Sequence, residues 1–372
     1  MNRLVIIGNG FDLAHDLKTS YKNFIDWYWG QRTRSLLTCD SRVSEDVLCK
    51  FEINKNYFFI KDWYIYSLNH NCFRDDHFKT MDAYSILSII ENDESCNVER
   101  SILLERITQN IENKGWVDIE SDYYELIKAN ADNIETCKSI NKQMDYLREQ
   151  LAVYLKEVSD PEPDEAISKA FHDNIFREDL ETSAQYSRTK DSGEVKTSKK
   201  CPPRNTLLLS FNYTPTAEMY LEESIRVNYI HGSLGKPKEM IFGYGDEMDK
   251  DFKDLENRNE NALLENSKSI KYLETSHYRD LLSFIEGGPF QVYIMGHSCG
   301  NSDRTLLNTI FEHQNCISIK PFCYINEKGE DNYSELTRNI YRNFSDKKLF
   351  RDRVVNKERC TTLDGRPLIN KE

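Results

Sequence analysis

The sequence lacks the features of a membrane or exported protein. Its longest apolar runs, at residues 4–7, 86–90 and 207–209, fall far short of the roughly 18 residues that a membrane-spanning helix needs. The first residues lead directly into a strand-like run that ends at Gly8, which leaves no space for the apolar stretch and cleavage site of a signal peptide. We therefore expect no membrane segment and a cytoplasmic location.

The cysteines lack the spacing of a metal site. The chain contains no Cys-x-x-Cys sequence and no pair of Cys and His at zinc spacing, although it has 10 cysteines in all. In a reducing cytoplasm, cysteines scattered in this way are mostly small core residues. We expect no structural zinc and no metal cofactor.

Positive charge is in deficit. The 372 residues include 49 Lys and Arg against 62 Asp and Glu, which gives a formal net charge of −13 at pH 7. An acidic surface repels phosphate backbones, so we expect no bulk binding of nucleic acid, with only a local basic patch left open. The length and the 39% of apolar residues indicate roughly two domains, each with a sizeable core.

What the sequence does have is an alternation of short apolar runs and helical patterns. Apolar runs that stop at Gly or a polar residue occur at residues 4–8, 207–213, 227–232, 240–245, 292–296 and 317–322. Helical spacing follows several of them, at residues 20–29, 214–225, 302–313 and 331–342. This alternation predicts an α/β fold, with a Rossmann-like parallel sheet and helices on its two faces.

The sheet is interrupted by a long segment of different character. Residues 36–204 have a charged, helical periodicity, which predicts a large, mostly helical insertion after the first strand and helix. We therefore expect a sheet domain from residues 1–35 and 205–345. The stretch at about 183–204 has the composition of a mobile linker, and residues 346–372 that of a charged C-terminal tail.

A Gly-x-Gly turn follows the first predicted strand. Gly8 and Gly10, on either side of Asn9, would let backbone N–H groups approach a phosphate at the end of the strand. The third glycine of the dinucleotide fingerprint is replaced by Leu13, which disfavours an ordinary nicotinamide dehydrogenase. A tight turn without a ligand stays open, and Asp12 is either a carboxylate at a helix start or a ligand to a sugar hydroxyl.

Further polar residues follow the later predicted strands. Asn212, His231, Asp246 and His297 each stand where an apolar run ends, and Asp303 comes shortly after the last of these. Ligands of open parallel sheets bind outside the carboxyl ends of the strands. We therefore expect these side chains and the first turn to converge on one site.

In their order along the chain, these blocks resemble the AbiH family of bacteriophage abortive-infection proteins. The blocks are Ile-Ile-Gly-Asn-Gly-Phe-Asp at 6–12, Lys-Thr-Ser-Tyr at 18–21, Trp-Val-Asp-Ile-Glu at 116–120, Ser-Phe-Asn-Tyr-Thr at 210–214, Ile-His-Gly at 230–232 and Gly-His-Ser-x-Gly-x-Ser-Asp at 296–303. Residues 36–110 and the tail carry no matching motif. The resemblance implies a bacterial antiphage effector that responds to a phage-derived trigger.

The same order of blocks also looks like a remote version of the sirtuin-type NAD fold. That resemblance implies that Asn212 contacts the nicotinamide ribose and that His231 is the base. It further implies an NAD site formed by Gly8, Asn9, Gly10, Asp12, Gly296, His297, Ser298 and Asp303, with phosphates at the glycines and Ser298.

The implied reaction is hydrolysis of NAD to nicotinamide and ADP-ribose, as in bacterial antiphage relatives of the sirtuin fold. Two departures stand against a deacetylase: the first turn reads Gly-Asn-Gly-Phe in place of Gly-Ala-Gly-Ile-Ser, and the zinc cysteines are absent. His231, with an ordinary pKa near 6.5, could take a proton from a ribose hydroxyl or a water. No metal is required.

Three alternatives stay open. A metal-dependent nuclease or RNA-directed toxin would use Asp118, Glu120 and Asp246 with Mg²⁺. Asp118 and Glu120 share one face if their segment is extended, or else they mark a helix start. Gly296-His-Ser298-Cys-Gly is a literal nucleophile-elbow sequence, but the only later histidine, His313, lies in the helix that follows. The third alternative is a nucleotide-sensing module without catalysis, in which the insertion serves as a lid, a phage sensor or a surface for homo-oligomer formation.

Overall fold

The computed structural model describes residues 1–38, 43–53, 96–114, 118–180 and 200–369. The chain forms two compact units, and we describe each by itself. The first unit comprises Met1–Thr19 and Leu155–Glu372, and the second unit comprises Ser20–Tyr154. No described helix is long and apolar enough to cross a membrane.

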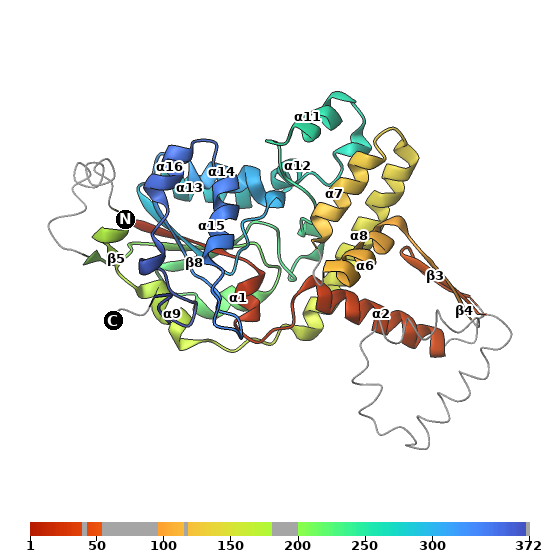
Figure 1. The fold of residues 1–372 in the computed structure, drawn as a ribbon, viewed down its shortest axis with the longest axis horizontal. Coiled ribbons are helices and arrows are strands. Elements are labelled where there is room, and N and C mark those ends of the chain that lie inside the picture. The colour runs from red at the N-terminus through yellow and green to blue at the C-terminus, as the bar shows by residue number, and fades with distance from the viewer. Residues whose placement is uncertain (39–42, 54–95, 115–117, 181–199, 370–372) are drawn as a thin grey trace, which may run out of the picture. The chain divides into compact units, whose positions relative to one another are not determined.

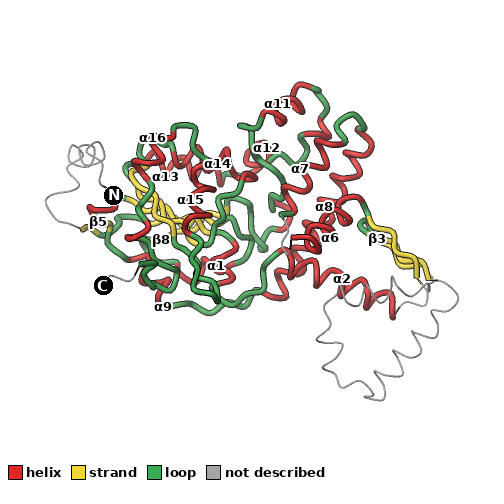
Figure 2. Tube along the Cα trace, in the orientation of Figure 1, coloured by secondary structure: helices red, strands yellow, loops and turns green. Residues whose placement is uncertain are grey.

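The first unit is built on a sheet of five parallel strands, drawn in yellow in Figure 2. Its strand order is β10-β9-β1-β7-β8, so the chain proceeds outward from β1 first on one side and then on the other. The strands are β1 (Asn2–Ile7), β7 (Thr206–Ser210), β8 (Ile225–Tyr229), β9 (Phe290–Met295) and β10 (Cys316–Pro321). The order is that of a Rossmann-like fold, which confirms the predicted α/β class, and its switch point lies between β1 and β9.

Apolar side chains on the two faces of β1 explain why the sheet is covered on both sides. Leu4 and Ile6 belong to one buried cluster, and Val5 and Ile7 to the other, because successive side chains of a strand point to opposite faces. The first cluster includes residues of α13 (His277–Glu286), α14 (Arg304–Phe311) and α15 (Tyr333–Arg342). The second includes residues of α9 (Glu165–His172) and of the 3₁₀-helix η2 (Pro215–Tyr220) (Figure 1).

Two sequence predictions differ from the structure here. Residues 240–245 form a loop instead of a strand, held by bonds from the Ile241 amide to the His231 carbonyl (2.8 Å) and from the Tyr244 amide to the Asn266 carbonyl (3.1 Å). The apolar residues of this loop are buried because it packs into the first unit, and not because it extends the sheet. Residues 214–225 give only the short helix η2, since β8 already begins at Ile225.

The C-terminal segment packs along the edge of the sheet, where the sequence predicted a charged tail. It contains α16 (Lys347–Arg353) and the 3₁₀-helix η7 (Lys357–Arg359), and Val354 bridges to Ile319 of β10. The buried guanidinium of Arg353 donates to the carbonyls of Phe311 and His313. Arg353 is thus a charged residue of this segment that packs into the interior and does not face solvent.

The boundaries of the units lie at Thr19 and Leu155, where the sequence suggested 35 and 205. Residues 155–180 join the first unit because α9 supplies Ile167 and Phe171 to a core cluster of the sheet. Of the expected linker, residues 183–199 lie outside the described part of the chain. The two residues that follow, Lys200–Cys201, form β6, which pairs with β5 (Ile175–Phe176).

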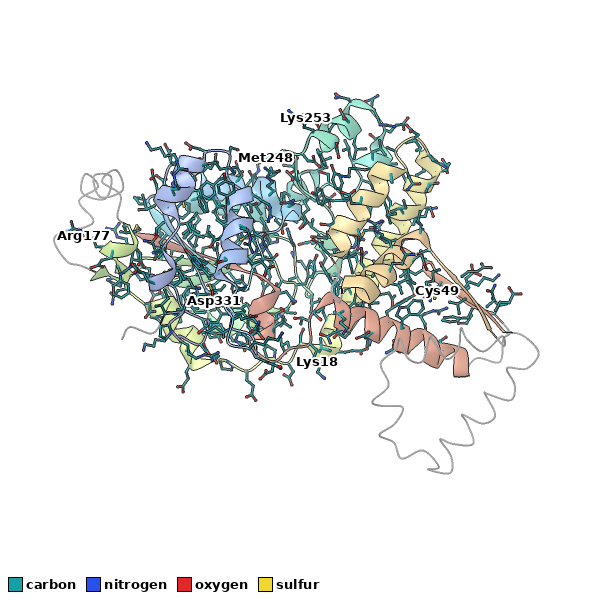
Figure 3. The ribbon with its side chains drawn as sticks, in the orientation of Figure 1. Lys18, Cys49, Arg177, Met248, Lys253 and Asp331 are labelled. Atoms are coloured by element: carbon teal, nitrogen blue, oxygen red, sulfur yellow. The ribbon has the colours of Figure 1, made fainter. Side chains whose placement is uncertain are left out.

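The second unit is mostly helical. Its elements are α2 (Tyr21–Thr38), β2 (Val43–Glu45), β3 (Cys49–Ile53), β4 (Cys96–Arg100), α6 (Ile102–Lys114), α7 (Ile119–Ala129) and α8 (Ile134–Val158), of which α8 continues past the boundary. The three strands form an antiparallel sheet, and Cys49 on β3 is labelled in Figure 3.

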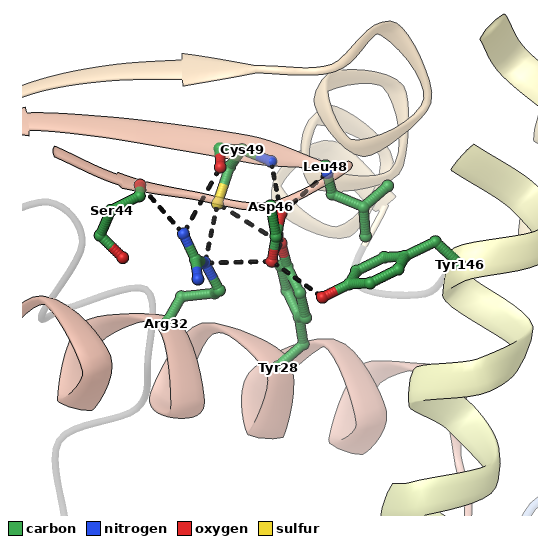
Figure 4. Close-up of polar contacts among 7 residues, drawn as sticks. All are labelled: Tyr28, Arg32, Ser44, Asp46, Leu48, Cys49 and Tyr146. Atoms are coloured by element: carbon green, nitrogen blue, oxygen red, sulfur yellow. Dashed lines mark hydrogen bonds and ion pairs between the residues drawn. The ribbon is translucent and has the colours of Figure 1, made fainter. Parts of the chain in front are cut away.

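Asp46, in the turn between β2 and β3, ties this sheet to two helices (Figure 4). Its carboxylate accepts hydrogen bonds from the amides of Leu48 and Cys49, from the hydroxyls of Tyr28 and Tyr146, and lies 3.2 Å from the guanidinium of Arg32. Tyr28 and Arg32 lie one helical turn apart on α2, and Tyr146 lies on α8. We call this group the Asp46 cluster.

Candidate functional site

The first turn and the turn after β9 meet backbone to backbone at the switch point. The amide of Gly8 donates to the carbonyl of Met295 (3.2 Å), and the amide of Gly10 to that of Gly296 (2.8 Å). A Cβ atom on Gly8 would lie 2.5 Å from Cα of His297, and one on Gly10 would lie 2.8 Å from Cα of Gly296. These approaches require glycine at both positions whatever the site binds.

The expected phosphate contacts stay a prediction after this observation. The amides of Gly8 and Gly10 already bond to carbonyls of the chain, so in this conformation they have no free N–H to offer a phosphate. Ser298 is exposed, and its hydroxyl is accessible to a ligand. Helix α1 (Asn9–Leu13), which follows the turn, is too short to form a separate anion site.

A first group of polar side chains fixes the first turn. The side-chain amide of Asn212 donates to the carbonyl of Gly8 (3.0 Å), and the hydroxyl of Thr214 donates to the carboxyl of Asp12 (2.6 Å). Burial raises the pKa of Asp12 against the effect of its hydrogen bonds. Asn9 accepts a bond from the hydroxyl of Thr19 (2.6 Å). The bonds of Asn212 and Asp12 therefore tie the segment after β7 to the turn after β1, and the bond of Asn9 ties this turn to Thr19.

A second group gathers around the carboxylate of Asp303. Nζ of Lys268 lies 2.7 Å from Oδ1, Nε2 of His231 lies 3.3 Å from the same oxygen, and Nε2 of His297 lies 3.6 Å from Oδ2. All four side chains are buried. His231 follows β8, His297 follows β9, Asp303 ends the 3₁₀-helix η6 (Asn301–Asp303), and Lys268 begins α12 (Lys268–Lys271). We call this group the Asp303 cluster.

The hydrogen-bond partners assign the tautomers of both imidazoles. Nδ1 of His297 accepts the amide N–H of Cys299 (2.9 Å), so a neutral His297 carries its proton on Nε2, toward Asp303. Nε2 of His231 lies 3.3 Å from the Asp303 carboxylate, which can only accept and so favours the proton on Nε2, while the Tyr272 hydroxyl at 3.1 Å can act as donor or acceptor. Nδ1 of His231 then has an unshared electron pair, and it makes no hydrogen bond with any residue that the structure describes.

Burial and charge together set the protonation states in the Asp303 cluster. Burial lowers the pKa of His231 to about 4, with the positive charge of Lys268 acting in the same direction and Asp303 against it. Burial alone would raise the pKa of Asp303, but Lys268 and the two histidines hold it well below its ordinary value. At neutral pH the site therefore contains a carboxylate, a nearby cation and a neutral imidazole with a free nitrogen.

Aromatic rings hold the His231 imidazole in place. Phe211 presents an edge-on contact to His231 and to His297, with ring centroids 5.0 and 4.3 Å apart. Tyr272 lies parallel to His231 at 6.0 Å. A base positioned in this way can accept a proton from a water or hydroxyl that approaches Nδ1.

The sequence named three members of this site and missed the rest. His231, His297 and Asp303 do come together, and their expected roles in an NAD site stay predictions. Lys268 and Tyr272 were missed because they lie in a charged segment of helical pattern, where a lysine is normally exposed. One signal was available: Gly243 and Gly245 allow their loop to approach residues 266–268, and a Cβ on Gly245 would lie 3.0 Å from Cβ of Lys268.

The elbow-like sequence does not form a serine hydrolase site. The non-glycine residue with positive φ in this segment is the buried Cys299 (54°), while Ser298 is exposed and has no such strain. The carbonyl of Ser298 accepts a bond from Asn339 of α15. His313 lies beyond the end of α14, and its Nδ1 accepts the amide of Asn315 (3.2 Å).

The acidic pair of the second unit marks a helix start. Asp118 is the N-cap of α7 and accepts the amide N–H of Ser121 (3.1 Å), and Glu120 lies in the first helical turn. The condition of an extended segment is therefore not met. Asp246, in the first unit, pairs with Arg304 (3.3 Å). Among the described residues, no three His, Cys, Asp or Glu side chains are arranged to hold a metal ion.

Comparison with known proteins gives one result. No curated protein and no solved structure matches the chain. The family model described as "Bacteriophage abortive infection AbiH" matches residues 4–324, from β1 through β10, and so includes both groups of polar side chains. The chain therefore belongs to the AbiH family, whose members act in abortive infection by bacteriophage.

Proposed function

We propose that this protein is an abortive-infection effector that binds NAD at the carboxyl edge of its sheet and hydrolyses it, with His231 as the general base. The observation that carries the proposal is the state of His231: a buried, neutral imidazole oriented through Nε2 by Asp303, with Nδ1 unpartnered among the described residues. Membership of the AbiH family supports a role in defence. A Rossmann-like sheet supports a nucleotide as the ligand.

For this reaction the protein must hold the ribose and a water in position and supply a base. The bond between the ribose C1′ and the nicotinamide nitrogen breaks, and its electron pair neutralises the charge of the pyridinium ring. The oxygen of a water forms a new bond to C1′, and the proton of that water passes to Nδ1 of His231 and then to solvent. The products are nicotinamide and ADP-ribose. A transition state rich in oxocarbenium character needs only a weak base, which suits a histidine of low pKa.

The residues fit the proposed substrate unevenly. A base is in place, and the exposed hydroxyl of Ser298 is available for a phosphate. The amides of Gly8 and Gly10 are not available for a phosphate, since they donate hydrogen bonds to the carbonyls of Met295 and Gly296. We therefore assign Asn212, Asn9 and Asp12 to the support of the site and leave the pyrophosphate to the region of Ser298.

The test measures NAD during phage challenge and nicotinamide release by the purified protein. We expect wild type to deplete NAD and His231→Gln to release nicotinamide about 10²–10⁴ times more slowly, the usual effect of losing a general base. His172→Gln is the matched control, because the exposed His172 lies at the end of α9 and, within the described part of the chain, pairs with Glu222 at 3.2 Å.

Two outcomes contradict the proposal. NAD binding without nicotinamide release, in cells and in the purified protein, means that the site senses a nucleotide. Unchanged NAD in infected cells, with protection that persists in His231→Gln, removes NAD and His231 together from the mechanism.

A further inference from the structure

We propose that Lys268 is a positioning residue that keeps His231 neutral by holding the carboxylate of Asp303 as its own counter-ion. This inference rests on the proposed function for its catalytic meaning. The effect of Lys268 on proton binding by His231 can be measured without any substrate.

The geometry gives Lys268 priority over His231 at the shared oxygen. Nζ of Lys268 lies 2.7 Å from Oδ1 of Asp303, whereas Nε2 of His231 lies 3.3 Å from it. The Lys268 side chain is only 1% exposed, so its charge is compensated within the protein and hardly by water. In such surroundings the shorter, charge-assisted bond dominates.

The backbone fixes Lys268 in this position. Its amide donates to the carbonyl of Tyr244 (3.0 Å), and the preceding residue, Ser267, forms a β-bridge with Tyr244. The opposing loop comes this close because residues 243 and 245 are glycine: a Cβ on Gly243 would lie 2.0 Å from the carbonyl oxygen of Asn266. The Gly-Tyr-Gly sequence thus allows this loop to pack against the segment that carries Lys268 and to hold it in place.

The consequence follows from the groups that face His231. These are Asp303 from η6, Lys268 from α12, His297 from the turn after β9 and the hydroxyl of Tyr272 from the 3₁₀-helix η5 (Tyr272–Glu274). Among the described residues that face His231, Asp303 is the anion. With Lys268 present, the net charge of the lysine and carboxylate pair is zero, and burial keeps His231 unprotonated. Without Lys268, the carboxylate would form an ion pair with a protonated His231 and occupy the base.

The experiment is an NMR titration of the Cε1–H signals of the full-length chain with ¹³C-labelled histidine. The chain has 8 histidines, and the signal of His231 is assigned by its loss in His231→Gln. We expect His231 of wild type to stay neutral throughout the range from pH 8 to pH 5. In Lys268→Met its titration midpoint should rise by about 2 pH units or more, a 100-fold change in proton affinity.

Three variants separate this role from a structural one. Lys268→Arg keeps the charge and should keep the low midpoint. Lys268→Met combined with Asp303→Asn removes cation and anion together, and the midpoint should return to a low value. Lys271→Met is the matched control, since Lys271 stands on the same short helix, pairs with Glu274 (3.2 Å) and should leave the midpoint unchanged.

The outcomes distinguish this inference from the proposed function. A midpoint in Lys268→Met within half a unit of wild type overturns the role of Lys268, whatever the protein does to NAD. If Lys268→Met does not fold, Lys268→Gln takes its place, since it also removes the charge but keeps a polar side chain, and an unchanged midpoint in it overturns the role of Lys268 in the same way. A raised midpoint in a protein that never releases nicotinamide supports the role of Lys268 and removes the proposed function.

Discussion

Asp46 in the second unit and Asp303 in the first are buried to the same degree, with 10% side-chain exposure in each case, but their partners differ in kind. Asp46 is surrounded by two amides, two tyrosine hydroxyls and an arginine, none of which changes its charge near neutral pH. Asp303 is surrounded by a lysine and two histidines. Burial of a carboxylate therefore does not by itself distinguish the two clusters, whereas the titratable partners of Asp303 do, and the proposed function depends on those partners.

The largest effect is expected from breaking the ion pair at Asp303. Asp303→Leu removes the carboxylate that lies 2.7 Å from the buried Nζ of Lys268, so the free energy of unfolding in urea should fall by about 3–5 kcal/mol. Lys268→Met combined with Asp303→Leu should recover most of that loss, because two apolar side chains replace the buried pair. If the double variant is no more stable than Asp303→Leu, the cluster is not held by this ion pair.

The pH dependence of stability comes next in size. His231 binds a proton near pH 6.5 when unfolded and near pH 4 when folded, so the unfolded state takes up the proton first as the pH falls. The stability contributed by a neutral His231 is therefore present above pH 6.5 and is lost between pH 6.5 and pH 4, by about 3 kcal/mol. His231→Gln should remove this part of the pH dependence in urea unfolding series, and an identical slope in the variant would assign it to other groups.

Asp46 should show the contrasting behaviour. Asp46→Asn keeps the shape but loses the charge that its five partners complement, so we expect a loss of about 2 kcal/mol in the free energy of unfolding. Because the retained partners do not titrate near neutral pH, the loss should be constant from pH 6 to pH 8 in the same urea series. A loss that varies over this range would place a titrating group in the Asp46 cluster and weaken the contrast with Asp303.

The sequence predicted the fold better than it predicted the site, and the reason is physical. Hydrophobic periodicity reports burial on a sheet face, which is why five of the six expected strands exist and why the core of β1 alternates between two clusters. Periodicity does not distinguish a strand from a buried loop, so residues 240–245 were misassigned. Strand ends indicated His231 and His297, but Lys268 reaches Asp303 from a distant short helix that no motif marks.

Glycine illustrates the same limit, because a Gly-x-Gly sequence does not say what the glycines approach. Gly8 and Gly10 approach the backbone of the turn after β9, which explains them without a phosphate. A phosphate site and a close approach of two turns both require glycine at these positions. They differ in what an added methyl group would contact: a bound phosphate in the first case and the backbone of the other turn in the second.

The smallest predicted effects are the changes in the free energy of unfolding on replacing one glycine in each unit by alanine. The two changes should have opposite signs. Gly10→Ala places a Cβ 2.8 Å from Cα of Gly296, a backbone atom that cannot move aside, so it should cost about 1–3 kcal/mol in thermal or urea unfolding. Gly30 lies inside α2, where an added Cβ would meet nothing within 4 Å. Gly30→Ala should therefore stabilise the protein by about 0.5–1 kcal/mol through its helix propensity alone. A destabilised Gly30→Ala would mean that α2 meets a partner at this position, and a neutral Gly10→Ala would mean that the two turns separate readily enough to expose their amides to a phosphate.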